Sequence, residues 1–398
     1  MTVGIGLFCV NVGCMLPREG MLDQEEADAE ADQVTTSGLA ATLGSGGGGP
    51  GTGVGSGAGT ADGGTSEPAD YGFRVLMTLV AGDSDLPAGY SVSVTFDHAS
   101  SVADGKSLPS GDDVRVFRDE AGTSTELDRV LDLDSEWNLA TTTMWFRTTQ
   151  SIDANHSDSS YFLYYGDPSA GAAPSDARSV FELFDDFDDG TLDPMWTKSM
   201  VGDASGAVSE AEGKLRITGQ TGEIWNGDDN CIFLNVPFEG GFSADSRVVG
   251  AGGVLAGWSR LGGVMVRQST GSASRNRLIA PVSGAGDAPG RMTSMRMTAG
   301  GETSLTAMGE MAIFPDYVRL QRSADRTRAF HSADGKTYAE LGSLATFTLS
   351  DPVRVGIPFA NLDGEAGWVE VDWFRVRKFT VDPMVELGAE EPGPFTVP

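Results

Sequence analysis

Cysteine and histidine are scarce in this chain of 398 residues. Of the three cysteines, Cys9 and Cys14 stand near the start, so only Cys231 lies in the body of the protein, and no disulfide framework is predicted there. The three histidines are far apart in the sequence: His98, His156 and His331. None has a second metal-type residue at a helical or strand spacing, so a zinc site is not predicted.

Basic charge is also scarce, because 27 lysine and arginine residues face 57 aspartate and glutamate residues, for a formal net charge of −30. Such an excess repels nucleic acid and anionic membrane surfaces over about a Debye length. Nucleic acid is therefore excluded as a predicted partner. The net charge does not exclude cations or neutral molecules as ligands.

Long apolar runs and long helical periodicity are absent as well. Beyond the first residues, no run reaches the roughly 18 apolar residues of a membrane-spanning helix. No serine stands in a G-x-S-x-G elbow, and the glycine-rich tract near residue 50 lacks the lysine of a phosphate-binding loop. No motif in the sequence therefore dictates a reaction.

The first 14 residues form a short apolar run, "MTVGIGLFCVNVGC", which an acidic segment follows. The run resembles a bacterial lipoprotein signal, which implies cleavage before Cys14 and lipidation of that residue. Asn11 departs from the pattern, since such signals carry a leucine-like residue there, and a buried first strand is the alternative. The resemblance implies a place in the cell envelope, at the outer membrane or cell surface, with membrane contact only through the lipid.

Residues 15–68 have a strongly biased composition in two pieces. The segment "DQEEADAEAD" is mostly acidic, and residues 36–68 are dominated by glycine, serine, threonine and alanine. Neither piece can bury enough apolar surface to offset the loss of backbone entropy. We therefore predict a disordered tether over residues 15–68.

From Tyr71 onward the chain consists of short alternating segments, such as "YGFRVLMTLV", "YSVSVTFD" and "TTTMWFRTT". In "YSVSVTFD" the large residues Tyr90, Val92, Val94 and Phe96 share one face, and serines and a threonine take the other. This period of two is typical of a half-buried antiparallel strand. With turn residues between the segments, the pattern predicts an all-β protein built from antiparallel β-sandwiches.

The order of "YGFRVLMTL", "GDDVRVFRDEAG", "TTTMWFRTTQ" and "YFLYYGDPSA" resembles the bacterial and archaeal surface module known as domain of unknown function 2341. Its hallmarks here are the pair Asp112-Asp113, the strand with Trp145, and the "YYGDP" ending. The resemblance covers residues 69–179. It implies a β-sandwich and a cell-surface context, and it supplies no chemistry.

A second domain is predicted over residues 180–388, with a C-terminal tail at 389–398. Its opening, "FELFDDFDDGTLDPMW", and later strands such as "GWVEVDWFRVRKF" resemble the concanavalin A-like, laminin-G-like lectins and glucanases, which implies a jelly roll. Asp334-Gly335 predicts a tight turn between Phe330 and Tyr338. The stretch "PMVELGAEE" from Pro383 resembles the closing strand of proteins that carry the first module.

The aspartates of the opening stretch allow three interpretations. A twelve-residue calcium loop is excluded, because "DDFDDG" lacks the alternating spacing and the closing glutamate. For a glucanase, the resemblance to the concanavalin A-like class implies a strand with the pattern E-x-D-x-x-E. The sequence contains no such strand, so a glycosidase is disfavoured. If the opening strand lies beside "VEVDWFRV", as in related sandwiches, Asp186 and Asp372 are candidate ligands of a structural calcium ion. The alternative, which stays open, is that these aspartates cap turns and face solvent.

Candidate ligand-binding residues are exposed tryptophans with polar neighbours, because an indole can stack on a sugar while amides and carboxylates take its hydroxyl groups. The loop-like stretch "GEIWNGDDNC" contributes Trp225, Asn226 and Asp228, "AGWSR" contributes Trp258, and Arg267 stands mid-strand. Trp145, Trp196 and Trp373 are assigned to the core.

The predicted function is noncatalytic recognition of a polysaccharide or glycoconjugate at the cell surface. The first alternative is a structural or protein-binding surface module without a sugar site. A glycoside hydrolase is the least favoured. Because one fold hosts binders, enzymes and spacers alike, the resemblance does not decide among them.

Overall fold

The computed structural model describes residues 68–220, 222–255, 257–283, 290–310, 312–362 and 366–395. Regular structure in these residues is almost entirely antiparallel β-strand, which confirms the predicted all-β class. Neither α-helix of the described chain, with six and four residues, is long enough to cross a membrane. Cys14, the predicted signal and the tether up to residue 67 lie outside the described residues.

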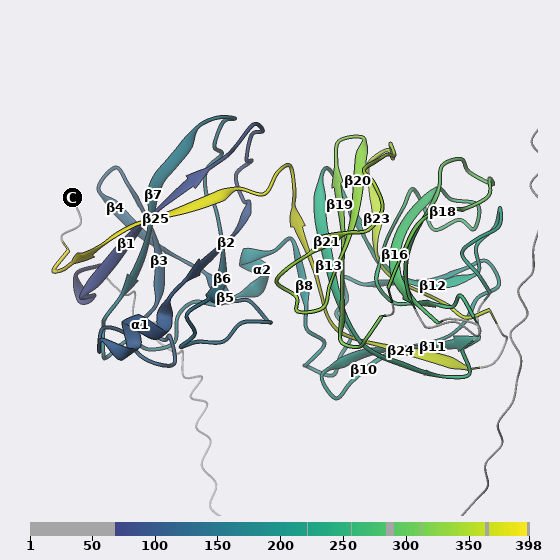
Figure 1. Cartoon of the computed structure of the whole chain (residues 1–398), viewed down its shortest axis with the longest axis horizontal. Helices are drawn as coiled ribbons and strands as arrows, with labels where there is room; N and C mark the ends of the chain where they lie inside the picture. The colour runs from purple at the N-terminus through teal and green to yellow at the C-terminus, as the bar shows by residue number, and fades with distance from the viewer. Residues whose placement is uncertain are drawn as a thin grey trace, which may run out of the picture. The chain divides into compact units, whose positions relative to one another are not determined.

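Eight strands form the first sandwich (Figure 1), and they are β1 (Phe73–Val80), β2 (Ser91–Phe96), β3 (Arg115–Glu120), β4 (Thr123–Leu127), β5 (Arg129–Leu131), β6 (Thr142–Arg147), β7 (Ser157–Tyr165) and β25 (Met384–Pro392). One sheet has the order β25-β1-β7-β3-β4, and the other has the order β2-β6-β5. Helix α1 (His98–Ala103) follows β2, and its N-cap Asp97 accepts a hydrogen bond from the backbone of Ser100.

The alternation of β2 is confirmed in the core of this sandwich. Val92 and Val94 are buried among the apolar side chains of β1, β6 and β7. Ser93 and Thr95 point to the opposite face, where they lie across from Trp145 and Thr143 of β6. The face that carries hydroxyl groups is therefore turned away from the core of the first sandwich.

Strand β25 returns to the first sandwich and pairs with β1, as the yellow strand in Figure 1 shows. The predicted boundary at residue 388 therefore differs from the structure, because residues 384–392 form one strand of the first sheet. Polar contacts hold it there: Glu390 accepts hydrogen bonds from Lys106 at 2.7 Å and from the Tyr165 hydroxyl at 2.6 Å. Its resemblance to a closing strand of the first module agrees with this pairing.

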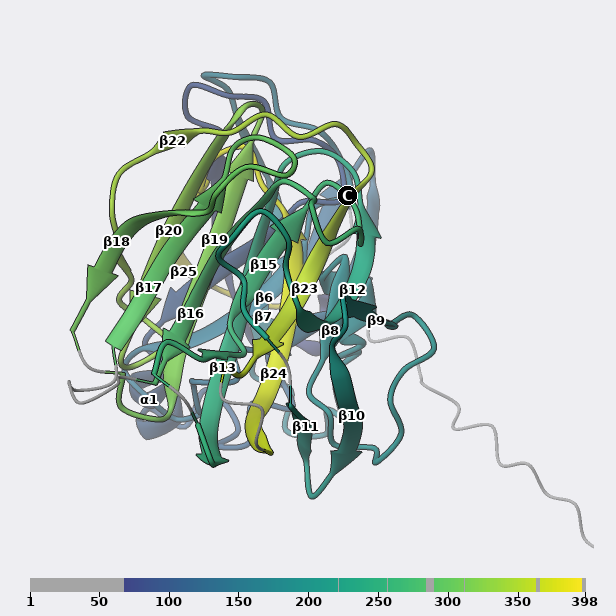
Figure 2. The same ribbon diagram turned by 90° about the vertical axis from the view of Figure 1, so that its right-hand side faces the viewer.

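Seventeen strands of the described chain form the second sandwich, which faces the viewer in Figure 2. They are β8 (Leu183–Asp185), β9 (Thr197–Val201), β10 (Ser205–Ala211), β11 (Lys214–Gln220), β12 (Cys231–Phe238), β13 (Phe242–Gly253), β14 (Arg260–Leu261), β15 (Val264–Arg267), β16 (Asn276–Val282), β17 (Gly290–Arg296), β18 (Ser304–Gly309), β19 (Asp316–Ser323), β20 (Arg326–Ser332), β21 (Ala339–Glu340), β22 (Ala345–Thr346), β23 (Val353–Ala360) and β24 (Gly367–Lys378).

The strands of the second sandwich divide into two sheets. One has the order β10-β11-β24-β13-β19-β20-β21, with β8 beside β24 and β22 beside β20. The other has the order β18-β17-β16-β14-β23-β12-β9, with β15 between β16 and β23. Alternate residues of the central strands, such as Val318 and Leu320 of β19, fill the core between the two sheets. This is the two-layer packing that buries one face of each sheet.

Two local predictions concern this sandwich, and the first is confirmed. The opening strand β8 lies beside the closing strand β24, with Asp185 opposite Phe374. Strands β20 and β21 pair on either side of Asp334-Gly335, but residues 333–338 connect them, so the turn is longer than the predicted tight turn and Tyr338 lies in it. Gly335 alone of the pair has a positive φ, of 71°. The short helix α2 (Ala177–Val180) precedes β8, and Val180 and Phe181 pack against Trp145 of the first sandwich.

A buried chain of charges links the two sandwiches. Asp245 of β13 stands directly opposite Arg319 of β19 and Arg375 of β24 in the register of the sheet. Its carboxylate accepts hydrogen bonds from Arg319 Nε at 2.5 Å and from Arg375 Nε at 2.9 Å. Arg375 Nη1 then donates to Asp132 of the first sandwich at 3.0 Å. We call Asp132, Arg375, Asp245 and Arg319 the charge chain.

Asp245 is completely buried, so the cost of removing it from water must be offset by its two partners. We therefore expect Asp245→Asn to lower the free energy of unfolding by about 3–5 kcal/mol, because it leaves the buried Arg375 and the partly buried Arg319 short of a carboxylate. Urea denaturation of the full chain would measure the change.

The matched control for this variant is Asp372→Asn, which breaks the partly exposed pair with Arg247 at 2.6 Å. Such a pair contributes about 1 kcal/mol or less. Equal losses of unfolding free energy in the two variants would contradict the large contribution that we assign to Asp245.

The same carboxylate predicts acid sensitivity. Burial alone would raise the pKa of Asp245, but the two guanidinium groups outweigh burial and lower this pKa below its usual value. A lowered pKa stabilises the fold above about pH 4, and this stabilisation is lost as the pH falls further. In wild-type protein, the free energy of unfolding should therefore fall below about pH 4 more steeply than in Asp245→Asn. Parallel pH profiles of the two proteins would refute this.

Candidate functional site

Trp225 and Trp258, which the sequence singled out separately, line the same cavity of the second sandwich. The cavity has a volume of about 340 Å³, and we call it the tryptophan pocket. Its lining residues are Glu223, Trp225, Trp258, Arg260, Leu305 and Leu362. Four of these six are tryptophan or leucine, so the pocket combines an apolar wall with one acid and one base.

Backbone hydrogen bonds hold both tryptophans in place. The carbonyl of Trp225, in the loop between β11 and β12, accepts from the Thr303 amide at 2.8 Å. Trp258 lies in the connection between β13 and β14, with a φ of 68°, which is uncommon for a bulky side chain. Its amide donates to the carbonyl of Ser283, and its own carbonyl accepts from Arg260 Nη1. Such strained positions occur at ligand-binding sites more often than elsewhere.

The two tryptophans differ in exposure. Trp258 is 45% exposed, while Trp225 is half-buried. All seven tryptophans lie in the described residues, and Trp258 is the one that is exposed. Its indole is therefore available for stacking by a ligand, and Trp225 forms the deeper wall.

Arg260 places a positive charge beneath the tryptophans. Its side chain is only 3% exposed, and its guanidinium carbon lies 6.0 Å from the ring centroid of Trp225. Burial lowers the pKa of Arg260 to about 10, while the carboxylates of Glu223 and Asp229 act in the opposite direction. Arg260 Nε has no hydrogen-bond partner in the described chain. Arg260 stays charged at neutral pH and keeps a donor for further contacts.

The other predicted ligand residues lie outside the pocket. Asn226 is exposed and donates to Glu223 Oε1, so it touches a lining residue without lining the cavity. Asp228 accepts from the Ser272 hydroxyl at 2.9 Å. Arg267 is a correction, because it is completely buried and forms an ion pair with Asp229 at 2.5 Å. Its remaining donors are bound by the backbone carbonyls of Ser269 and Gly271, and the side chain has no exposed surface, so a ligand does not reach the guanidinium group.

Sequence reasoning missed four of the lining residues, and two of them carried a local signal. Glu223 and Arg260 stand inside the same stretches as the tryptophans, "GEIWNGDDNC" and "AGWSR". Leu305 and Leu362 are distant in sequence from both stretches, and no local pattern connects them to the pocket.

The two predicted calcium ligands differ in their surroundings. Asp372 accepts from Arg247 at 2.6 Å, whereas burial and the neighbouring Asp188 raise the pKa of Asp186. Asp185, next to Asp186, accepts from the Trp196 indole at 2.6 Å. No group of three metal-ligating side chains is found in the part of the chain that the structure describes. The calcium ion stays a prediction.

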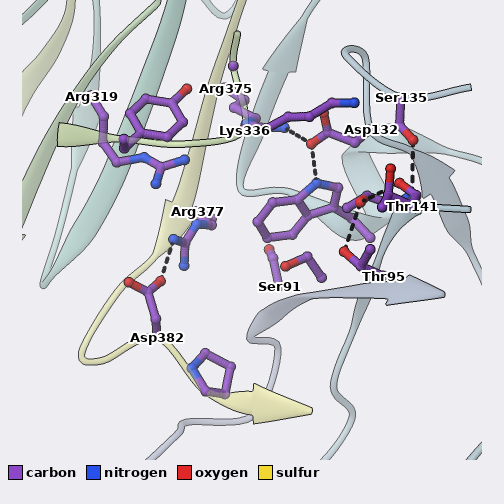
Figure 3. A pocket seen from close by; sticks show the side chains of 16 residues that line it. Ser91, Thr95, Asp132, Ser135, Thr141, Arg319, Lys336, Arg375, Arg377 and Asp382 are labelled. Atoms are coloured by element: carbon purple, nitrogen blue, oxygen red, sulfur yellow. Dashed lines mark hydrogen bonds and ion pairs between the residues drawn. The ribbon is translucent and has the colours of Figure 1, made fainter. Parts of the chain in front are cut away.

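A second cavity lies where the two sandwiches meet, and we call it the inter-sandwich cleft (Figure 3). Its volume is about 460 Å³. The first sandwich contributes the hydroxyl face of β2 and β6 together with Trp145, whose indole donates to Asp132 at 2.6 Å. The second sandwich contributes Arg319 and Tyr338. The guanidinium carbon of Arg319 lies 3.8 Å from the ring centroid of Tyr338, so a cationic and an aromatic group lie side by side on this wall.

One family model matches the chain: Domain of unknown function (DUF2341), over residues 110–199. The match begins in the first sandwich before β3 and ends in β9 of the second. It confirms the predicted resemblance for this part of the chain. No curated protein matches the chain.

Several solved structures are similar to part of this chain at low scores. A functionally unknown protein from Saccharomyces cerevisiae is 19% identical, with 52% of this chain and 98% of that chain covered and a TM-score of 0.36. The GH43 BlXynB protein from Bacillus licheniformis is 16% identical over 64% of this chain and 50% of that chain, with a TM-score of 0.39. The chain thus spans about half the length of the latter. LamAcat from Zobellia galactanivorans is 12% identical, with 50% of this chain and 97% of that chain covered and a TM-score of 0.35.

The exposure of Trp258 predicts the response of tryptophan fluorescence to a soluble quencher. Because the other six indoles are buried or half-buried, Trp258→Phe should remove most of the fraction that acrylamide quenches easily. Trp368→Phe is the matched control, since Trp368 is half-buried under Arg216 at 4.2 Å. Unchanged quenching in Trp258→Phe would contradict the geometry of the pocket.

Proposed function

We propose that the protein binds a glycan, without catalysis, through the tryptophan pocket. The observation that carries the proposal is that the exposed indole of Trp258 and the indole of Trp225 line one cavity together with Glu223 and Arg260. Sugar rings have apolar faces that stack on indoles, and their hydroxyl groups pair with carboxylate and guanidinium groups. The pocket offers both kinds of contact within about 340 Å³.

The carboxylates near the two cavities favour binding over hydrolysis. Glycosidases use two carboxylates across the scissile bond, one of them with a raised pKa. The lining residues of the tryptophan pocket include one carboxylate, Glu223. In the inter-sandwich cleft, burial opposes ionisation of Asp132, but Arg375 and the Trp145 indole outweigh it and lower the pKa of Asp132. A carboxyl group held ionised in this way is a poor general acid.

The rival function is a protein-binding surface module, and one observation favours it. Leu305 and Leu362 are exposed beside Trp258, and together they present an apolar surface that suits a protein side chain as well as a sugar ring. In either case, lipidation at Cys14 and the tether would hold the binding domain at the cell envelope. That placement rests on the resemblance of the N-terminal segment to a lipoprotein signal.

Binding to a glycan array and to insoluble polysaccharides, with the full chain, tests the proposal. Each assay is run with calcium and again with a chelator, so that a contribution of the predicted ion is measured separately. We expect Trp258→Ala and Trp225→Ala to weaken binding at least about tenfold, as for other central aromatic contacts.

Trp368→Ala is the matched control, because it removes a half-buried indole outside the pocket. It should leave glycan binding unchanged. Failure of the folded wild-type chain to bind any glycan would refute the proposal and favour the protein-binding module.

A further inference from the structure

The inter-sandwich cleft reverses the charge balance of the chain. Over the whole sequence, acidic residues outnumber basic ones by 57 to 27. Among the residues that line the cleft, four are basic and two are acidic: Arg319, Lys336, Arg375, Arg377, Asp132 and Asp382. A local excess of positive charge in so acidic a protein requires an explanation.

Two of these cations are engaged within the protein. Arg319 and Arg375 share the carboxylate of Asp245, and Arg375 also donates to Asp132. Their charge is neutralised by the charge chain. Arg319 and Arg375 therefore hold the walls of the cleft in position and have few hydrogen-bond donors left for a ligand.

Lys336 and Arg377 are the two cations that still have hydrogen-bond donors for a ligand. The Lys336 ammonium has no ion pair or hydrogen bond with other described residues, although it lines the cleft. The side chain of Arg377 is 3% exposed, and its Nη2 donates to the exposed Asp382 at 2.8 Å. Arg377 Nε is buried and has no hydrogen-bond partner among the residues that the structure describes. A buried donor without an acceptor is costly, so an acceptor from outside would be favourable.

Neutral polar groups complete the cleft. On the side of the first sandwich, the Thr95 and Thr143 hydroxyl groups lie 2.8 Å apart, and Ser93 of β2 also lines the cleft. On the other side, the buried Tyr338 hydroxyl has no hydrogen-bond partner within the described residues. Arg375 and Arg377 lie 5.0 and 5.4 Å from the Trp145 ring centroid, so the guanidinium groups take the place of a stacked ligand there.

We propose that the inter-sandwich cleft binds a saccharide that carries a carboxylate, that is, a hexuronate unit. The carboxylate accepts charge-assisted hydrogen bonds at Lys336 and Arg377. The sugar hydroxyl groups meet Ser93, Thr95 and Tyr338. The volume of about 460 Å³ suits a sugar unit better than an inorganic ion.

The proposal does not depend on the tryptophan pocket, since no residue lines both cavities. It is also compatible with the net charge of −30. A short oligosaccharide carries few charges, and repulsion from distant carboxylates is screened beyond about 8 Å at physiological ionic strength. A long polyanion, by contrast, would meet the acidic surface outside the cleft.

Calorimetric titration of the full chain with three probes tests the proposal. The probes are trigalacturonate, its fully methyl-esterified form, and tricarballylate, which carries three carboxylates without sugar hydroxyl groups. We expect trigalacturonate to bind at least about tenfold more tightly than either of the others, because only it offers both kinds of group. Equal binding of the ester, equal binding of tricarballylate, or no binding of trigalacturonate would each overturn the proposal.

Variants locate the site. Lys336→Gln should weaken trigalacturonate binding about tenfold without unfolding the chain, because the Lys336 side chain is exposed and only its backbone amide contacts Asp334. Lys198→Gln, which changes an exposed lysine of β9 outside the cleft, should bind as wild type. Trp258→Ala should also bind trigalacturonate as wild type, which separates this site from the tryptophan pocket. A loss in Trp258→Ala, or none in Lys336→Gln, would overturn the assignment.

Discussion

The packing of the two sandwiches against each other depends on the hydrogen bonds that the buried carboxylate of Asp245 accepts. It lies between Arg319 and Arg375 in the register of three neighbouring strands, and Arg375 extends the contact to Asp132 of the first sandwich. A charge with no exposed surface is tolerated only with partners in good geometry, so the strands that carry these partners cannot slip without a large cost. The walls of the inter-sandwich cleft are built on the same strands.

The two cavities differ in the kind of structure that forms them. The two tryptophans of the tryptophan pocket lie in connections, in the segments before β12 and β14, where ligand-binding residues are commonly found. Arg260 of β14 and Leu305 of β18 complete the lining from strands. The inter-sandwich cleft is formed by the outward faces of sheets, with Thr95 on β2 and Arg377 on β24. Residues in loops can be substituted without loss of the fold. Residues of the cleft also support the packing of the two sandwiches, so their substitution affects that packing.

Much of the fold follows from local patterns, and the sites follow from them only in part. The period-two alternation of β2 and the turn at Gly335 predicted strands and a hairpin that the structure contains. Trp225 and Trp258 have polar, loop-like flanks that exclude them from an alternating strand, and the structure places both at one cavity. Their role as ligand contacts stays a prediction. Arg267 was wrong, because the sequence does not show that Asp229 lies over the end of β15 and buries the guanidinium group.

The sequence by itself determined the all-β class, the side of each strand that faces a core, and the stretches that hold the exposed aromatic residues, because these depend on contacts between near neighbours in the chain. Only the tertiary structure decided what lies against the outward faces. Ser93 and Thr95 have the pattern of solvated residues, yet they line a cleft with Arg375 and Arg377. Likewise, Met384–Pro392 joins the sheet of β1 after the whole second sandwich intervenes. Such pairings are selected by burial and charge between residues hundreds of positions apart, for which local periodicity contains no information.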